Sequence, residues 1–87
     1  MNKDWTDNAW EEYLYWQQND KKTIKRINKI IEDIDRNGNM GIGKPERLTG
    51  NLSEYWSRRI DDCNRIVYKI EKNIIKIAQC GSHYRDK

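Results

Sequence analysis

The sequence contains no phenylalanine, only one proline and one histidine, and no long apolar run. Acidic residues interrupt its first stretch, MNKDWTDNAW, where a secretory signal needs continuous apolar residues. No later stretch is long enough to cross a bilayer as a helix. These absences predict a cytoplasmic protein without a signal peptide or a membrane span. The missing phenylalanine by itself excludes no function.

Cysteine is also scarce. Cys63 and Cys80 are too few for a disulfide framework, and in a chain without a secretory signal we expect them to be reduced thiols. A zinc centre built from these two residues and His83 would lack a fourth ligand and the paired spacing of zinc sites. We therefore expect neither a metal ion nor another cofactor.

The residues that are present suffice for one small core. Charged residues make up 36% of the chain, but four Trp, five Tyr and many Ile accompany them. This composition is typical of a folded soluble protein rather than a disordered one. Because 87 residues are enough for one domain with a modest core, we expect a single domain over residues 1–87.

Charge is distributed unevenly along the chain. Residues 1–20 contain one lysine and five acidic residues, whereas residues 21–36 contain six basic and three acidic residues. A basic helix face is most often simply solvated, and the alternative is a surface for a nucleic-acid phosphate backbone. The six basic residues are Lys21, Lys22, Lys25, Arg26, Lys29 and Arg36.

Two amphipathic helices are predicted in the first half of the chain. A short strand at NKDW precedes Thr6 and Asn8, either of which can cap the first helix. Helical spacing places Trp10, Tyr13, Leu14 and Gln17 on one face, and we expect Trp10 and Leu14 in the core. Asp20 is placed to cap a second helix, whose isoleucines recur at the period of one buried face: Ile24, Ile27, Ile31 and Ile34.

The second half of the chain has the pattern of strands. A segment from Arg36 to Asn51 holds four of the five glycines and the proline, so the chain leaves the helix and crosses the surface there, with Glu46 in the crossing. The stretches YWSRRI, RIVYKI and IIKIAQC then predict three antiparallel strands joined by hairpins. The expected fold is α+β, with two N-terminal helices packed on one face of a small, mainly antiparallel sheet.

The turns predict which strand residues face one another. A two-residue turn at Lys72 and Asn73 sets Glu71 opposite Ile74 and, by counting back along both strands, Arg65 opposite Cys80. A turn at Asp62 and Cys63 sets Ile60 opposite Arg65, with Arg59 beside it. A bulge or a slip of one residue would bring both guanidinium groups onto one face.

Three side chains form the minimum set for breaking an RNA phosphodiester bond without a metal. Glu46 can take the proton of the ribose 2′-hydroxyl, and protonated His83 can donate a proton to the departing 5′-oxygen. Arg65 can stabilise the charge that accumulates on the phosphoryl oxygens. The alternative is that Arg65 is a strand-edge charge paired with Asp61 or Asp62.

Two other functions fit the same features. The basic helix and the arginines also suit a non-catalytic protein that binds RNA or the ribosome. Exposed aromatic residues suit a protein-interaction module, with Trp5, Tyr15 or Trp16 as the anchor.

Longer motifs resemble a known family. The stretches GIGKPERL, NLSEYWSRRIDDCNRIVYKI and the final HY, in this order and at this spacing, are similar to the Txe/YoeB toxins within the RelE-like group. The resemblance extends from Trp5 to Tyr84. It implies the RelE-like microbial RNase fold and a bacterial, cytoplasmic toxin that cuts mRNA in the A site of the 70S ribosome. It also implies a YefM-like or Axe-like antitoxin as partner and often self-association as a homodimer.

The resemblance also assigns roles to residues. The catalytic glutamate, arginine and histidine of the family fall on Glu46, Arg65 and His83, and its terminal tyrosine falls on Tyr84. Positions that hold phosphates fall on two further residues, Lys44 and Arg59.

Three departures from the family pattern bear on the site. Thr49 stands where some relatives have a lysine, which weakens one phosphate contact or leaves it to Arg47. Asn64 replaces a histidine found in some members, so His83 is the only imidazole available as an acid. Residues 85–87 extend the chain beyond the usual HY end.

Overall fold

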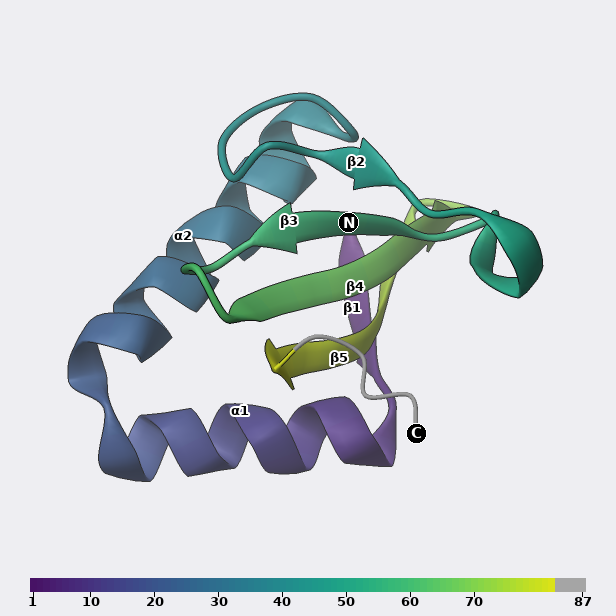
Figure 1. Cartoon of the computed structure of the whole chain (residues 1–87). Helices are drawn as coiled ribbons and strands as arrows, with labels where there is room; N and C mark the ends of the chain where they lie inside the picture. The colour runs from purple at the N-terminus through teal and green to yellow at the C-terminus, as the bar shows by residue number, and fades with distance from the viewer. Residues whose placement is uncertain (83–87) are drawn as a thin grey trace.

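The computed structural model describes residues 1–82, which form two helices and a five-stranded mixed sheet (Figure 1). The helices are α1 (Asp7–Asn19) and α2 (Lys21–Asn37). The strands lie in the order β1-β5-β4-β3-β2, and a short 3₁₀ helix, Gly50–Leu52, follows β2. Their bounds are β1 Asn2–Trp5, β2 Glu46–Arg47, β3 Trp56–Arg59, β4 Asn64–Glu71 and β5 Ile74–Ser82.

The predicted fold class is confirmed, as is the short strand predicted at NKDW, which is β1; the structure adds one strand, β2. Strands β2 to β5 pair antiparallel, whereas β1 pairs parallel to β5 at one edge. The other edge is β2, a two-residue strand inside the segment that the sequence predicts only as a surface crossing. Helix α1 runs beside β5, and α2 stands beside the turn that joins β3 to β4 (Figure 1). No helix within residues 1–82 is long and apolar enough to cross a membrane.

Side-chain caps explain where the helices begin. The hydroxyl oxygen of Thr6 accepts a hydrogen bond of 3.0 Å from the backbone N–H of Ala9, so Thr6 rather than Asn8 caps α1. Asp20 caps α2 by accepting a bond of 3.1 Å from the N–H of Thr23. Because Asp20 also ends α1 in an extended conformation, one residue suffices to redirect the chain between the helices.

The core is built mainly from isoleucine. In α2 the buried residues are Ile27, Ile30, Ile31 and Ile34, which confirms three of the four predicted positions; Ile24 is only partly buried. The sheet contributes Ile66, Tyr68, Ile75, Ile77 and Cys80.

The prediction that Trp10 and Leu14 belong to the core is wrong. Trp10 is 45% exposed, and Leu14 is half-buried outside the core cluster. The inward face of α1 is formed by Ala9, Tyr13 and Trp16, so Tyr13 is the one residue of the predicted face that packs against the core. Trp16 is drawn inward because its indole N–H donates a hydrogen bond of 2.8 Å to the backbone oxygen of Cys80.

The predicted register is correct at the β4–β5 turn and wrong by one residue beyond it. Lys72 and Asn73 have φ values of +53° and +63°, as a tight hairpin turn requires, and Glu71 pairs with Ile74. A bulge between Val67 and Tyr68 then shifts the ladder, so that Arg65 lies opposite Gly81 instead of Cys80.

The β3–β4 register is also shifted. Arg65 pairs with Arg59 rather than with Ile60. The reason is a longer turn than predicted, closed by a hydrogen bond of 2.8 Å from the N–H of Ile60 to the oxygen of Asn64. Because paired residues point to the same face of a sheet, this slip places both guanidinium groups on one side.

Candidate active site

Glu46 and Arg65 come together across β3. Strand β2 places Glu46 opposite Ser57, and Ser57 lies beside β4, where Arg65 is the second residue. The Nη1 atom of Arg65 is 3.6 Å from Oε1 of Glu46 and donates a hydrogen bond of 3.2 Å to the hydroxyl of Ser57. The carboxylate side chain is 68% exposed, so water screens this ion pair and a substrate can reach both groups. The alternative pairing of Arg65 with Asp61 or Asp62 is not what the structure forms.

A pocket of about 410 Å³ opens beside this pair. Thr49 and Arg47 are among its walls, so the position at which the resemblance implies a lysine in some relatives does face the candidate site. Arg47 is partly committed elsewhere, because its Nε atom donates a hydrogen bond of 2.9 Å to the backbone oxygen of Ser53. The complete lining is Glu46, Arg47, Leu48, Thr49, Leu52 and Arg65.

Lys44 and Arg59 flank the same end of the sheet. Arg59 pairs with Arg65 in the strand ladder, and its N–H donates a hydrogen bond of 2.6 Å to the oxygen of Gly43. This bond ties the residue just before Lys44 to β3. Within residues 1–82 neither Lys44 nor Arg59 takes part in an ion pair, so both cations are available to an anionic ligand.

The approach of Gly43 to β3 explains why glycine occupies this position. Gly43 has a φ of +82°, and an added Cβ atom would lie 3.1 Å from the backbone oxygen of Arg59 and 3.2 Å from Cβ of Arg58. A larger residue would push the crossing segment away from β3 and, with it, Lys44 and Glu46.

Arg58 is a residue that the sequence reasoning missed. Its side chain is fully buried, and its Nη1 atom lies 2.6 Å from Oδ2 of Asp33 on α2. This hydrogen bond from Arg58 holds the pKa of Asp33 below its usual value. The guanidinium also bonds four groups around it: the backbone oxygens of Gly38, Met40 and Ile42, and the hydroxyl of Tyr68.

These bonds make Arg58 the internal support of residues 38–42, which lead into Lys44 and Glu46. The signal that could have found it is strand alternation in YWSRRI. Consecutive strand residues point to opposite faces, so of two adjacent arginines one must point toward the helices.

His83 and Tyr84 lie outside the described residues. The last described residue of β5, Ser82, pairs with Asn64, which immediately precedes Arg65. Strand β5 therefore pairs with Asn64 and Arg65 through its last two described residues, and the HY motif follows directly in the sequence.

The two cysteines have different surroundings, and neither is placed to act in this pocket. Burial, with a smaller contribution from Glu12, raises the pKa of the Cys80 thiol to about 12. Such a thiol stays protonated at neutral pH and is a poor nucleophile. Cys63 is exposed in the β3–β4 turn, and both cysteines are free.

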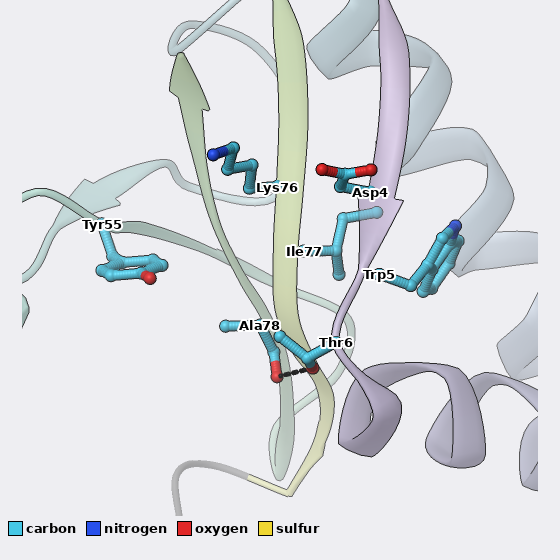
Figure 2. Close-up of a pocket in the computed structure, with 7 residues that line it drawn as sticks. All are labelled: Asp4, Trp5, Thr6, Tyr55, Lys76, Ile77 and Ala78. Atoms are coloured by element: carbon cyan, nitrogen blue, oxygen red, sulfur yellow. Dashed lines mark hydrogen bonds between the residues drawn. The ribbon is translucent and has the colours of Figure 1, made fainter.

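A second pocket, of about 360 Å³, lies at the β1–β5 edge and holds none of the predicted site residues (Figure 2). The hydroxyl of Thr6 donates a hydrogen bond of 3.0 Å to the oxygen of Ala78 at its rim (Figure 2). Lys76, another of its residues, forms an ion pair of 2.9 Å with Glu71. Its charged lysine is thus already neutralised, whereas the cations around Glu46 include two without partners among residues 1–82.

Comparison with known proteins gives consistent matches over nearly the whole chain. The family model described as the YoeB-like toxin of bacterial type II toxin-antitoxin systems matches residues 5–84. Toxin YoeB of Streptomyces coelicolor is 51% identical over 79 residues, which are 91% of this chain and 94% of that protein.

Solved structures agree in fold as well as in sequence. The YoeB toxin in a heterotetrameric YoeB-YefM complex from Staphylococcus aureus superposes with a TM-score of 0.91 at 52% identity, covering 97% of this chain and 98% of that one. A YoeB dimer from the same organism superposes with a TM-score of 0.90 at 52% identity and the same coverage.

Proposed function

The chain belongs to the YoeB-like toxins of bacterial type II toxin-antitoxin systems, and from this membership we propose that it is an endoribonuclease that cuts mRNA in the ribosomal A site and thereby stops translation. The fold is RelE-like. The single observation that carries the proposal is the pairing of Glu46 with Arg65 beside an open pocket, with Lys44 and Arg59 at its margin.

In the proposed reaction the 2′-oxygen of a ribose attacks the adjacent phosphorus. Glu46 accepts the proton of the 2′-hydroxyl as the new O–P bond forms, and the bond from phosphorus to the 5′-oxygen breaks. His83, acting as the acid, donates its proton to that 5′-oxygen, so the downstream fragment leaves with a 5′-hydroxyl. Tyr84 completes the proposed catalytic set. Each proton transfer is expected to contribute a factor of roughly a hundred to ten thousand.

Arg65 stabilises the charge that develops on the phosphoryl oxygens. Its planar guanidinium can bind two of these oxygens at once. The hydrogen bond from Nη1 to the hydroxyl of Ser57 orients the group before a substrate arrives. Because the 3.6 Å contact with Glu46 is exposed, a phosphate can take the place of the carboxylate without breaking a buried ion pair. Lys44 and Arg59 would bind neighbouring phosphates.

The proposed reaction uses no metal. The carboxylate, the imidazole and the guanidinium together supply the base, the acid and the charge stabilisation that a bound cation provides in other nucleases. A mild net charge of +3 gives low affinity for free RNA, which favours dependence on the ribosome for positioning the mRNA.

We also propose a cytoplasmic location, an antitoxin of the YefM or Axe type as partner, and self-association as a homodimer. The YoeB of Staphylococcus aureus has been solved with YefM and as a dimer, which supports both partners. Of the three predicted anchors only Tyr15 is exposed, because Trp5 and Trp16 pack against the core. Tyr15 and the exposed Trp10, both on α1, are suitable anchors for another chain.

The deciding experiment replaces one carboxylate oxygen of Glu46, the proposed base, by an amide nitrogen. Glu46→Gln preserves shape but cannot accept the proton, so cleavage of ribosome-bound mRNA should fall at least a hundredfold while binding to ribosomes is retained. Mapping of mRNA 5′ ends on stalled ribosomes measures cleavage, and sedimentation measures binding. Glu11→Gln is the matched control, because Glu11 is an exposed carboxylate on α1, outside the pocket.

The rival function, a non-catalytic inhibitor that only binds RNA or the ribosome, makes the opposite prediction. Its favouring observation is the set of cations near the pocket that form no ion pair within the described part of the chain, since such cations serve binding as well as catalysis. If Glu46→Gln blocks translation as strongly as the unchanged protein and no new 5′ ends appear with either, the nuclease proposal is wrong.

A further inference from the structure

The first half of α2 carries a group of cations that have no ion-pair partner among residues 1–82. We call Lys21, Lys22, Lys25, Arg26 and Lys29 the basic face. No acidic residue occurs from Lys21 to Ile31, and within residues 1–82 none of the five cations forms an ion pair. In the second half of the helix two of the three acids are engaged, Asp33 with Arg58 and Asp35 with the N-terminal amine and Lys3. The third, Glu32, is exposed and forms no ion pair within residues 1–82.

Helix geometry gives the basic face a regular form. Lys21, Lys25 and Lys29 are all exposed and follow at intervals of four residues, so their Cα atoms lie roughly 6 Å apart along one side of α2. Lys22 and Arg26 line a shallow cavity of about 280 Å³ between α2 and the β3–β4 turn.

One acidic residue, Asp61, also lines this cavity, together with Thr23 and Ile60. Its Oδ1 atom accepts hydrogen bonds of 2.8 Å from the N–H groups of Cys63 and Asn64, and both of its oxygens accept bonds from the amide of Asn64. The carboxylate keeps its negative charge, but these bonds hold it within its own turn, and among residues 1–82 it forms no ion pair with Lys22 or Arg26.

The basic face borders the candidate active site. The β3–β4 turn beside α2 connects Arg59 at the end of β3 to Arg65 near the start of β4 (Figure 1). Cations thus extend from the exposed side of α2, past the turn, to the end of the sheet where a phosphate would react.

We propose that the basic face binds the phosphate backbone of ribosomal RNA and holds the toxin on the ribosome while Glu46 and Arg65 act on the mRNA. This inference rests on the proposed function. Through this surface a protein of low net charge gains affinity for the ribosome. Five cations concentrated on one face bind a phosphate backbone far better than the same charges spread over the surface.

The absence of apolar anchors favours RNA over a protein at this face. The large apolar residues exposed in residues 1–82 are Trp10, Tyr15, Met40, Ile42 and Leu52, and none lies on α2. Stable protein interfaces are dominated by buried aromatic or aliphatic anchors, whereas phosphate contacts need only cations.

The test compares two triple variants that lose the same charge. The first, Lys21→Gln with Lys25→Gln and Lys29→Gln, removes three cations of the basic face. The control, Lys3→Gln with Lys72→Gln and Lys76→Gln, removes three cations that lie outside the basic face, on β1, on the β4–β5 turn and on β5. The full-length chains are measured for affinity to purified 70S ribosomes across a salt series and for cleavage of ribosome-bound mRNA, with circular dichroism to verify folding.

We expect the basic-face variant to bind ribosomes roughly ten to a hundred times more weakly at about 0.15 M salt, with a salt dependence reduced by about two to three phosphate contacts. Its cleavage rate at saturating ribosomes should equal that of the unchanged chain, so the loss appears in KM and not in kcat. The control should lose less than about threefold in affinity.

The proposal is overturned if the two triple variants bind ribosomes equally, or if the unchanged chain does not bind them. It is also overturned if the basic-face variant binds ribosomes normally and loses affinity for its antitoxin instead, because the face then serves a protein. If the unchanged chain binds ribosomes without cutting mRNA, the proposed function fails, while the comparison of the two variants still decides the role of the basic face.

Discussion

Arg58 and Arg59 are neighbours in the chain with unrelated roles. Consecutive strand residues point to opposite faces of the sheet. The side chain of Arg58 therefore points into the core, where it is fully buried, and that of Arg59 lies on the face that carries Arg65. The first arginine supports the segment that leads to Glu46, and the second is free to contact a substrate. When two basic residues are adjacent in a strand, a structural or a functional role therefore has to be assigned to each of them separately.

Thr49 lines the pocket at a position where the family resemblance leads us to expect a lysine in some relatives. We predict that Thr49→Lys adds a cation beside Glu46 and lowers the KM for ribosome-bound mRNA about threefold to tenfold, because a phosphate gains a charge-assisted contact. Steady-state cleavage kinetics measure the change. Asn51→Lys adds the same charge on an exposed residue outside the pocket lining and should change KM much less. Equal effects of both substitutions would contradict a phosphate position at Thr49.

Among the elements, the segment between α2 and β3 depends most on long-range contacts. It has little regular structure of its own, only the two residues of β2 and a 3₁₀ turn. Its shape is held by the bonds of Arg58 to the oxygens of Gly38, Met40 and Ile42 and by the bond from Arg59 to Gly43. The position of Glu46 is thus determined by β3 and α2 rather than by its sequence neighbours.

This arrangement predicts that Arg58→Met destabilises the protein by about 3–5 kcal/mol, because Asp33 and the backbone oxygens lose their partner in a poorly solvated site. Urea unfolding followed by circular dichroism measures the free energy of unfolding. Arg59→Met is the control and should change stability by less than about 0.5 kcal/mol, since its side chain is partly exposed and has no ion pair within residues 1–82. If the two variants are equally stable, Arg58 does not support the segment.

Over the whole molecule, ion pairs and hydrogen bonds to carboxylates connect parts that are distant in sequence. The hydrogen bond from Arg58 lowers the pKa of Asp33, and the hydrogen bond from the N-terminal amine lowers the pKa of Asp35. On the β4–β5 hairpin, the hydrogen bond from Lys76 lowers the pKa of Glu71. Each carboxylate is therefore easier to ionise in the folded chain than in the unfolded one.

A folded-state pKa below the unfolded value means that the contribution to stability is complete above the unfolded pKa, about 4, and is lost as pH falls through the folded pKa. We predict a melting temperature that changes little from pH 7 to pH 5 and falls below about pH 4. The difference in melting temperature between the unchanged chain and Asp33→Asn should shrink over the same acidic range, as calorimetry can measure.

Asp62→Asn is the control for this pH series, because Asp62 forms no hydrogen bond or ion pair within residues 1–82. Its melting temperature should follow that of the unchanged chain at every pH. A constant difference between the unchanged chain and Asp33→Asn down to pH 2 would contradict the assigned role of the Asp33 carboxylate.

Much of the architecture follows from local sequence signals. The cap at Asp20, the isoleucine period of α2 and the turn at Lys72 and Asn73 act between residues that are close in the chain, so the sequence predicts them correctly. The alternative caps Thr6 and Asn8 were not separable, because both have a suitable side chain and only the folded backbone selects one.

For the candidate site, the sequence predicted the residue types, and the tertiary structure brings Glu46 to Arg65. The roles of Glu46, Arg65, His83 and Tyr84, and those of Lys44 and Arg59, stay predictions, as does the single domain. The register was missed because one bulged residue in β5 and a longer β3–β4 turn leave no local signature.

The sequence by itself determined the helices, the hairpin strands, the basic face of α2 and the family. Only the tertiary structure decided the pairing of Arg59 with Arg65, the burial of Arg58 and the exposure of Trp10. The physical reason is the distance along the chain over which each kind of interaction acts. Backbone propensities, caps and side-chain periodicity act over a few residues, whereas register, burial and the partners of a charge depend on contacts between segments that meet only in the folded chain.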